Sequence, residues 1–141
     1  MTGFVLDNSV SMRWLLESNK KSDQQYAEAV LKSLVGVDAL VPNLWHLEAT
    51  NVLLEAEKRR QVEAGEIERF ISQLENLPLH VDPLTSRQSF NRIMALGRIY
   101  KLSSYDATYL ELAHREGLPL ATLDKALRKA ALKADIELYL I

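Results

Sequence analysis

The chain contains no cysteine, which excludes disulfide bonds, thiolate metal ligands and cysteine nucleophiles. It has no apolar run near the roughly 18 residues that a membrane helix requires. Its first apolar segment, Phe4 to Leu6, ends at once in Asp7 and does not have the form of a secretory signal. The sequence also lacks a glycine-rich phosphate loop and a nucleophile elbow. These absences predict a cytoplasmic protein with no membrane segment.

The 141 residues are enough for one domain with a hydrophobic core. The composition, with 48% hydrophobic and 26% charged residues, is typical of a globular protein. Short apolar runs of strand length alternate with segments of helical periodicity. We therefore predict a single domain over residues 1–141 of the α/β class, with a five-stranded parallel sheet between two helix layers (α/β/α). The expected strands are 3–6, 39–41, 79–81, 118–123 and 136–141. The expected helices are 10–16, 22–34, 43–62, 66–77, 86–100, 105–117 and one that begins directly after Asp124.

The stretch from Ser103 to Asp124 has an acid at each of two helix entrances, Asp106 and Asp124, with a short strand between them. Such a unit brings both carboxylates near one edge of a parallel sheet, where open α/β sheets bind their ligands. Asp7 follows the first strand in the same way. Each of these three acids has a simpler interpretation as a helix cap. For the helix of Asp106, Ser103 or Ser104 could be the cap instead.

Glu48 stands on a helix face that is otherwise largely apolar, between Leu44, Trp45 and Val52. An unpaired charge would be costly there, and no Lys or Arg occurs on this face for more than two turns. A metal ion is therefore an economical partner for its carboxylate. Asn51 lies one turn further on the same side.

Taken together, four acids from separate segments could converge on one pocket: Asp7, Glu48, Asp106 and Asp124. Carboxylates a few ångströms apart repel each other unless cations neutralise them. Oxygen ligands without His or Cys suit Mg²⁺ or Mn²⁺, ions that activate water in phosphoryl hydrolysis. With these four set aside, 15 acids remain against 17 Lys and Arg, so the net charge of −2 does not exclude a nucleic-acid substrate.

Several polar residues near the acids are predicted to support the site. Ser9 and Thr122 each stand two residues from an acid and could hydrogen-bond within the site, although a local turn is an equal alternative. Asn51 and Ser104 complete the supporting set. Three basic residues on the helix after Asp124 are placed to contact a phosphate backbone, although a solvated face is the simpler interpretation: Lys125, Arg128 and Lys129.

Four stretches of the sequence, in this order, resemble the PIN-domain family, and within it the VapC-type ribonuclease toxins of toxin–antitoxin pairs. They are Val5 to Ser9, Pro42 to Leu53, Leu102 to Ala113 and Leu120 to Leu127. Any one of them is a weak motif, but the four in order span nearly the whole chain. Asn8 departs from the family pattern, in which a small residue or Thr is commoner.

The resemblance implies a five-stranded parallel sheet, a homodimer and Mg²⁺- or Mn²⁺-dependent endonucleolytic cleavage of RNA. It makes Asp7, Glu48, Asp106 and Asp124 the catalytic acids and metal ligands, with Asp7 and Asp106 as the main ligands. Glu48 and Asp124 would complete the hydration shell of the metal, hold a second ion or orient the attacking water.

The resemblance also implies a cognate VapB-like antitoxin. A basic side chain of such a partner could enter the acidic pocket. The first two helices offer apolar side chains that could seat an amphipathic partner helix: Trp14, Leu15, Tyr26 and Val30.

Two other functions fit parts of the pattern. A PIN-fold module that binds RNA or protein without catalysis would have the same fold. A phosphatase of the haloacid-dehalogenase type also carries an Asp after its first strand, but it needs a second Asp two residues later, where this chain has Ser9.

Overall fold

The computed structural model describes residues 3–141, so residues 1 and 2 of the predicted domain lie outside the described part. Within residues 3–141, four parallel strands form one sheet in the order β3-β2-β1-β4. The strands are β1 (Phe4–Leu6), β2 (Ala39–Pro42), β3 (Leu79–Asp82) and β4 (Leu120–Ala121).

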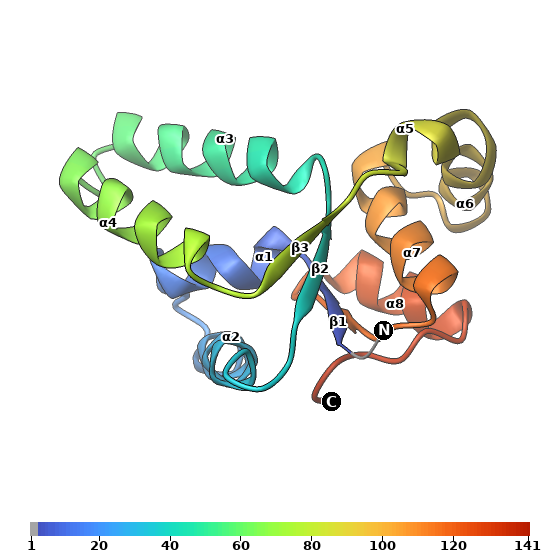
Figure 1. Cartoon of the computed structure of the whole chain (residues 1–141), viewed down its shortest axis with the longest axis horizontal. Helices are drawn as coiled ribbons and strands as arrows, with labels where there is room; N and C mark the ends of the chain where they lie inside the picture. The colour runs from blue at the N-terminus through green and yellow to red at the C-terminus, as the bar shows by residue number, and fades with distance from the viewer. Residues whose placement is uncertain (1–2) are drawn as a thin grey trace.

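Helices cover both sides of this sheet (Figure 1). The crossovers from β1 to β2 and from β2 to β3 lie on one side, and the chain returns along the other side to reach β4. The first side holds α1 (Asn8–Ser11), a 3₁₀ turn (Met12–Trp14), α2 (Lys21–Ser33), α3 (Trp45–Lys58) and α4 (Ala64–Glu75). The second side holds α5 (Thr85–Gln88), a π-helical turn (Ser89–Ile93), α6 (Met94–Tyr100), α7 (Ser104–Glu116) and α8 (Lys125–Lys133).

The predicted α/β class with a parallel sheet is confirmed, but the predicted fifth strand is wrong. Residues 136–141 form only an isolated bridge, at Leu138 beside Leu120. Their partner β4 is two residues long, so Leu120 alone supplies the pairing: its N–H donates to the carbonyl of Glu137, and its carbonyl accepts from the N–H of Tyr139. Leu140 then takes a left-handed φ of 60°, which ends the extended segment.

The helix predicted over 86–100 is interrupted. A π-helical turn separates α5 from α6, and within it Ser89 Oγ donates to the carbonyl of Thr85 at 3.0 Å. A hydroxyl that binds the preceding turn in this way competes with the backbone and bends a helix. Of the apolar residues in this segment, Ile93 is buried, whereas Phe90 is 94% exposed and Met94 is 44% exposed.

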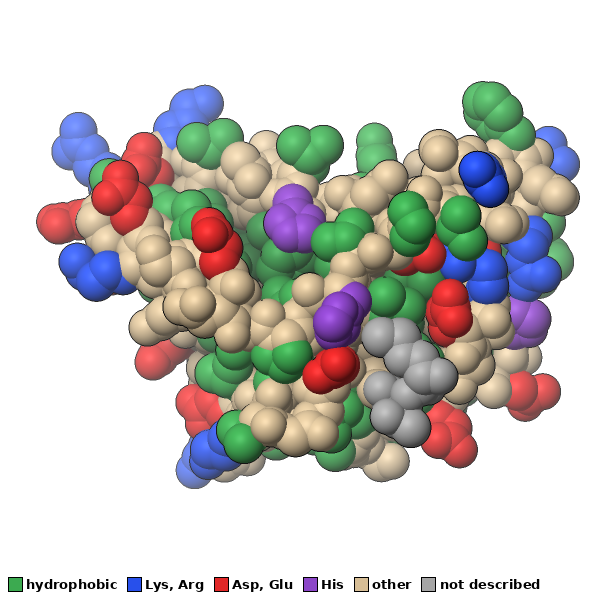
Figure 2. Space-filling model, viewed as in Figure 1, with side chains coloured by type: hydrophobic (Ala, Val, Ile, Leu, Met, Phe, Trp, Pro, Cys, Tyr) green, Lys and Arg blue, Asp and Glu red, His purple; other side chains and the backbone are tan. Residues whose placement is uncertain are grey.

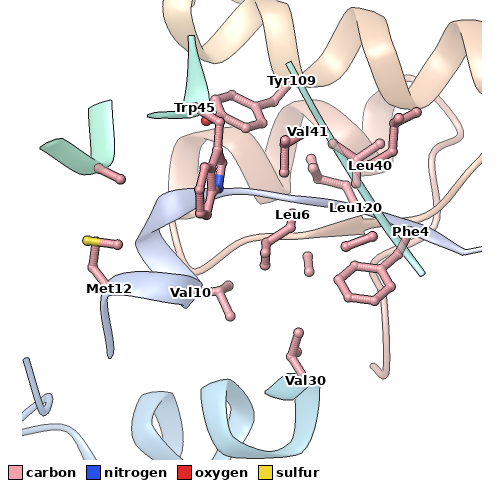
Figure 3. Close-up of a cluster of buried hydrophobic side chains, with 14 of the residues drawn as sticks. Phe4, Leu6, Val10, Met12, Val30, Leu40, Val41, Trp45, Tyr109 and Leu120 are labelled. Carbon is pink, nitrogen blue, oxygen red and sulfur yellow. The ribbon is translucent and has the colours of Figure 1, made fainter. Parts of the chain in front are cut away.

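The core lies around β1, which has a neighbouring strand on each side and helices on both faces. Its residues Phe4, Val5 and Leu6 are completely buried, which explains why the strand is a continuous apolar run and does not alternate. Figure 3 shows Leu6 and Phe4 surrounded by side chains from several elements. Among them Val30 is also completely buried, so it cannot seat a partner helix as the sequence predicted.

A buried ion network ties the end of β3 to α7. Arg115 donates to both oxygens of Asp82, at 3.0 and 2.9 Å, and to both oxygens of Glu111, at 2.8 and 3.1 Å. These hydrogen bonds raise the pKa of Arg115 further above its usual range. Asp82 and Glu111 are almost fully buried, so the network fixes α7 against the edge of the sheet.

The described part of the chain contains no helix with both the length and the apolar character needed to cross a bilayer.

Candidate acidic site

The four predicted acids stand where helices begin, mostly just after the carboxyl ends of strands. Asp7 directly follows β1 and precedes α1, and Asp124 caps α8 three residues after β4. Glu48 is in the first turn of α3, and Asp106 is in the first turn of α7. The order of the strands places β1 beside both β2 and β4, so these segments open on the same edge of the sheet.

Asp7 is the most enclosed of the four and is 7% exposed. Its N–H donates to the carbonyl of Ala121 at 3.0 Å, which fixes it beside the end of β4. Its Oδ2 accepts from Ser9 Oγ at 2.6 Å and from Thr122 Oγ1 at 2.7 Å. Burial raises the pKa of Asp7, the two hydroxyls oppose this rise, and the charge of Asp124 adds to it. Asp7 makes no side-chain cap to α1, so the simpler interpretation as a helix cap does not apply to it.

Ser9 and Thr122 join the segments that carry Asp7 and Asp124. Their hydroxyl oxygens are 3.2 Å apart. Ser9 Oγ also accepts from the N–H of Leu123 at 2.9 Å, and Thr122 Oγ1 accepts from the N–H of Asp124 at 3.1 Å. Both hydroxyls therefore link residues more than a hundred positions apart, around the carboxylate of Asp7.

Glu48 is half-buried, and its partner is a tyrosine. Tyr109, which α7 buries completely, donates its hydroxyl to Glu48 Oε1 at 2.5 Å. Burial raises the pKa of Glu48, the Tyr109 hydrogen bond opposes the rise, and the charges of Asp7 and Asp106 add to it. Burial also raises the pKa of Tyr109, and the nearby carboxylate of Asp7 adds to this effect, so the phenol stays a proton donor.

Asp106 and Asp124 differ in their local roles. Ser103 caps α7, since its Oγ accepts from the N–H of Asp106 at 3.1 Å, which leaves the carboxylate of Asp106 outside the cap. Burial raises the pKa of Asp106, and the charges of Asp124 and Asp7 add to the rise. Asp124 does act as a cap, because its Oδ1 accepts from the N–H of Leu127 at 3.1 Å. One carboxylate oxygen of Asp124 is thus engaged by its own helix.

Among the hydrogen bonds of residues 3–141, two of the predicted supporting residues make none through their side chains to the acids. Asn51 is exposed on α3, one turn beyond Glu48. Ser104 is exposed as well, and only its backbone carbonyl is engaged, by Thr108 Oγ1 at 2.7 Å.

The three predicted phosphate contacts on α8 divide into two groups. Lys125 and Lys129 are exposed. Arg128 is only partly exposed, because its Nε donates to the carbonyl of Thr122 at 2.7 Å and its guanidinium lies 4.9 Å from the centre of the Tyr26 ring. Arg128 therefore braces the loop between β4 and Asp124.

Two residues with a clear place at the site were not identified from the sequence. In the sequence Tyr109 falls among the apolar positions of its helix, and the available signal is that a buried tyrosine usually needs a hydrogen-bond partner. Asn8 holds α1 to the start of α3: its Nδ2 donates to the carbonyl of Trp45 at 2.8 Å, and its Oδ1 accepts from Ser11 Oγ at 2.8 Å.

The donor set of this site is made of oxygen atoms alone. Carboxylates and hydroxyls are the ligands that suit Mg²⁺ or Mn²⁺, and the three histidines are engaged elsewhere or exposed. Within residues 3–141, no three acidic or histidine side chains form a ready-made metal cage. The residues thus fit a hard cation by their chemistry. Their charges also interact: Asp124 raises the pKa of Asp7, Asp7 and Asp106 raise that of Glu48, and Asp124 and Asp7 raise that of Asp106.

A family model described as the PIN domain matches residues 4–133. Comparison with curated proteins finds no match.

Several solved structures resemble the fold. PAE2754 from Pyrobaculum aerophilum is 20% identical, with a TM-score of 0.66 over 91% of this chain and 84% of that one. A toxin–antitoxin complex from Klebsiella pneumoniae is 19% identical, with a TM-score of 0.61 over 86% of this chain and 87% of that one. FitAcB from Neisseria gonorrhoeae is 16% identical, with a TM-score of 0.60 over 96% of each chain. At these identities the likeness concerns the fold.

Proposed function

The chain belongs to the PIN domain family, and from this premise we propose that it is a metal-dependent endoribonuclease, the toxin of a toxin–antitoxin pair. PIN domains are typically nucleases. The observation that carries the proposal is the gathering of Asp7, Glu48, Asp106 and Asp124 at one edge of the sheet, where burial and mutual repulsion raise the pKa of the first three.

The hydrogen bonds around these acids prepare them to hold a cation. Both hydroxyls at Asp7 bind Oδ2, so neither of them competes for Oδ1. Tyr109 binds Oε1 of Glu48 and leaves Oε2 to other partners. Asp7, Glu48 and Asp106 would hold Mg²⁺ or Mn²⁺, with Asp124 beside them. A bound ion of this kind neutralises the carboxylates, activates water and stabilises the phosphate oxygens during hydrolysis.

Cleavage of single-stranded RNA by the purified protein tests this proposal. We expect cleavage with Mg²⁺ or Mn²⁺, none in excess EDTA, and loss of at least about 100-fold in Asp7→Asn and Asp106→Asn. The matched control is Asp135→Asn, which changes an exposed acid that follows α8. RNA binding without cleavage by the wild type would favour the alternative, a non-catalytic binding module, and equal activity in all variants would contradict the acidic site.

An antitoxin partner is proposed on the charge of the pocket. Among the ion pairs formed by residues 3–141, none involves the four site acids, so a Lys or Arg of a partner could pair with them. One solved structure with this fold is described as a toxin–antitoxin complex. Co-expression with the product of the neighbouring reading frame should give co-purification and inhibition, and inhibition should fall when basic residues in the C-terminal half of the partner become Ala. If this chain instead purifies without the co-expressed partner and keeps full activity, the proposed antitoxin partner is contradicted.

A homodimer is proposed on an exposed apolar edge. Figure 2 shows hydrophobic side chains along the side of the molecule formed by α3 and the α5–α6 region. The large exposed hydrophobic residues of these elements are Leu47, Leu54, Phe90, Met94 and Ile99. Where such side chains form a contiguous apolar patch, the patch marks an interaction site. Analytical ultracentrifugation should show a dimer, and Leu47→Asp should weaken its association. A wild type that is monomeric at all concentrations would contradict the proposed homodimer.

A further inference from the structure

Basic residues are concentrated in the segment between β3 and α7. Residues 83–105 contain four Lys or Arg and no Asp or Glu, whereas the rest of the chain has 13 Lys or Arg against 19 acids. Figure 2 shows Lys and Arg side chains over the α5–α7 end of the molecule. A protein of net charge −2 thus keeps a segment in which every charged side chain is basic.

A groove of about 540 Å³ runs between the end of α6 and α8. Its walls carry Lys101, which directly follows α6, and Lys129 and Lys133 from α8, with Ile99 and Tyr100 beside them. All three lysines are exposed, and none forms an ion pair with any residue in 3–141. We call this feature the lysine groove.

Both walls of the lysine groove belong to segments that lead to site acids. Lys129 and Lys133 are one helical turn apart on the same face of α8, about 7.5 and 13.5 Å along the axis from Asp124. On the other wall, Leu102 donates its N–H to the carbonyl of Gly97 at 3.0 Å, and a Cβ on Gly97 would lie only 3.2 Å from the oxygen of Leu102. This close turn leads from Lys101 directly into the cap of α7 and so to Asp106.

Arg128 is the contrasting case on the same helix. Its guanidinium is engaged by the carbonyl of Thr122 and the ring of Tyr26, so its charge is used within the fold. Among residues 3–141 the lysines of the groove have no such partner, and Lys129 and Lys133 place two positive charges along one face of α8.

We propose that the lysine groove binds the phosphodiester backbone of an RNA strand on one side of the cleaved bond. This inference rests on the proposed function and deepens it, since it assigns the path of the substrate beyond the acids. Lysines act on phosphates as point charges and do not read bases, so the groove contributes affinity that is independent of sequence and sensitive to salt.

Binding of a fluorescent single-stranded RNA of about 20 nucleotides to the Asp7→Asn protein, measured from about 50 to 300 mM KCl, tests the groove. Adding Lys129→Ala and Lys133→Ala should weaken binding about tenfold at low salt and reduce the slope of log Kd against log salt by about 1.4, since each phosphate contact on a single strand contributes about 0.7. The control, Lys21→Ala with Lys32→Ala, removes two exposed lysines from the two ends of α2 and should leave both quantities unchanged.

The outcomes separate this inference from the proposed function. If the wild type cleaves RNA but the groove variant and the α2 control bind RNA alike, the groove proposal is overturned and the nuclease stands. If the wild type cleaves nothing but the groove variant still loses its salt-dependent binding, the groove stands as an RNA site and the nuclease proposal falls. Binding of poly-glutamate together with no binding of RNA would overturn the proposal in favour of an acidic protein partner.

Discussion

The hydrogen bond between Tyr109 and Glu48 is the most specific feature of the site at the residue scale. It brings a neutral donor to a half-buried carboxylate that has no ion pair among residues 3–141. A phenol can hold such a group without cancelling its charge, which a Lys or Arg would do. The partner that the fold gives Glu48 is thus neutral, as the proposed binding of a cation requires.

We expect Tyr109→Phe to lower the stability of the metal-free protein by about 1 kcal/mol at pH 7, the usual net value of one hydrogen bond. The loss should shrink at pH 4, where Glu48 is protonated, because the bond favours the charged carboxylate and opposes the raised pKa of Glu48. Urea unfolding of the wild type and the variant at pH 7 and at pH 4 measures this loss of stability. Tyr105→Phe, which alters an exposed tyrosine on the same helix, is the control, and an equal loss in both variants would contradict the assigned role.

The raised pKa of Asp7 predicts how the metal-free protein responds to pH. An acid whose pKa is higher in the folded than in the unfolded state favours folding below its unfolded pKa, and this contribution is lost as the pH rises through the folded pKa. Burial and Asp124 raise the pKa of Asp7, so Asp7 lowers stability at neutral pH.

Asp7→Asn should therefore melt at or above the wild-type temperature in EDTA at pH 7.5, and the difference should vanish near pH 3.5, where both side chains are neutral. Calorimetry at the two pH values measures this. A variant that melts clearly lower at pH 7.5 would show that the carboxylate of Asp7 serves the fold and not a cation.

At the scale of elements, α7 connects the acidic site with strand β3. Its first turn carries Asp106, its middle carries Tyr109, and its last turn carries Arg115, which binds Asp82 at the end of β3. The position of the acidic site thus depends on an ion network at the opposite end of the same helix.

We expect Arg115→Ala to destabilise the protein by about 3–5 kcal/mol, because it leaves the buried charges of Asp82 and Glu111 without a partner. Chemical denaturation measures this loss. Arg59→Ala is the control: its i,i+4 pair with Glu55 is exposed, and its loss should cost no more than about 0.5 kcal/mol. A loss in Arg115→Ala as small as in the control would mean that water can replace the network.

At the scale of the whole molecule, the four acids come from segments that span nearly the entire chain, so a cation bound among them would bind only the folded state. We expect 100-fold excess of Mg²⁺ or Mn²⁺ over its Kd to stabilise the wild type by about 2.7 kcal/mol. Thermal melts in the chloride salts measure this, with KCl of equal ionic strength as the control. Asp7→Asn should lose most of the gain, and a wild type that does not respond to either ion would contradict the metal proposal.

Much of the fold could be predicted from the sequence, because its signals are local. The apolar run Phe4–Leu6, the stop at Gly117 and the capping position of Asp124 depend on neighbours in the chain, and all of them appear in the structure. The alternation of strands and helices likewise predicted a parallel sheet. An acid directly after a strand, such as Asp7 after β1, predicted a carboxylate at the carboxyl end of that strand.

Only the tertiary structure decided which residues meet. Whether the last segment became a strand depended on the length of its partner β4, two residues, which left a single bridge at Leu138. The partner of Glu48 is 61 positions away, and the hydroxyls of Ser9 and Thr122 are 113 apart. Periodicity and capping act over a few residues, whereas such contacts arise from the order of the strands in the sheet. The sequence by itself therefore determined the kinds of side chain at the site, and the packing of the chain determined which of them are partners.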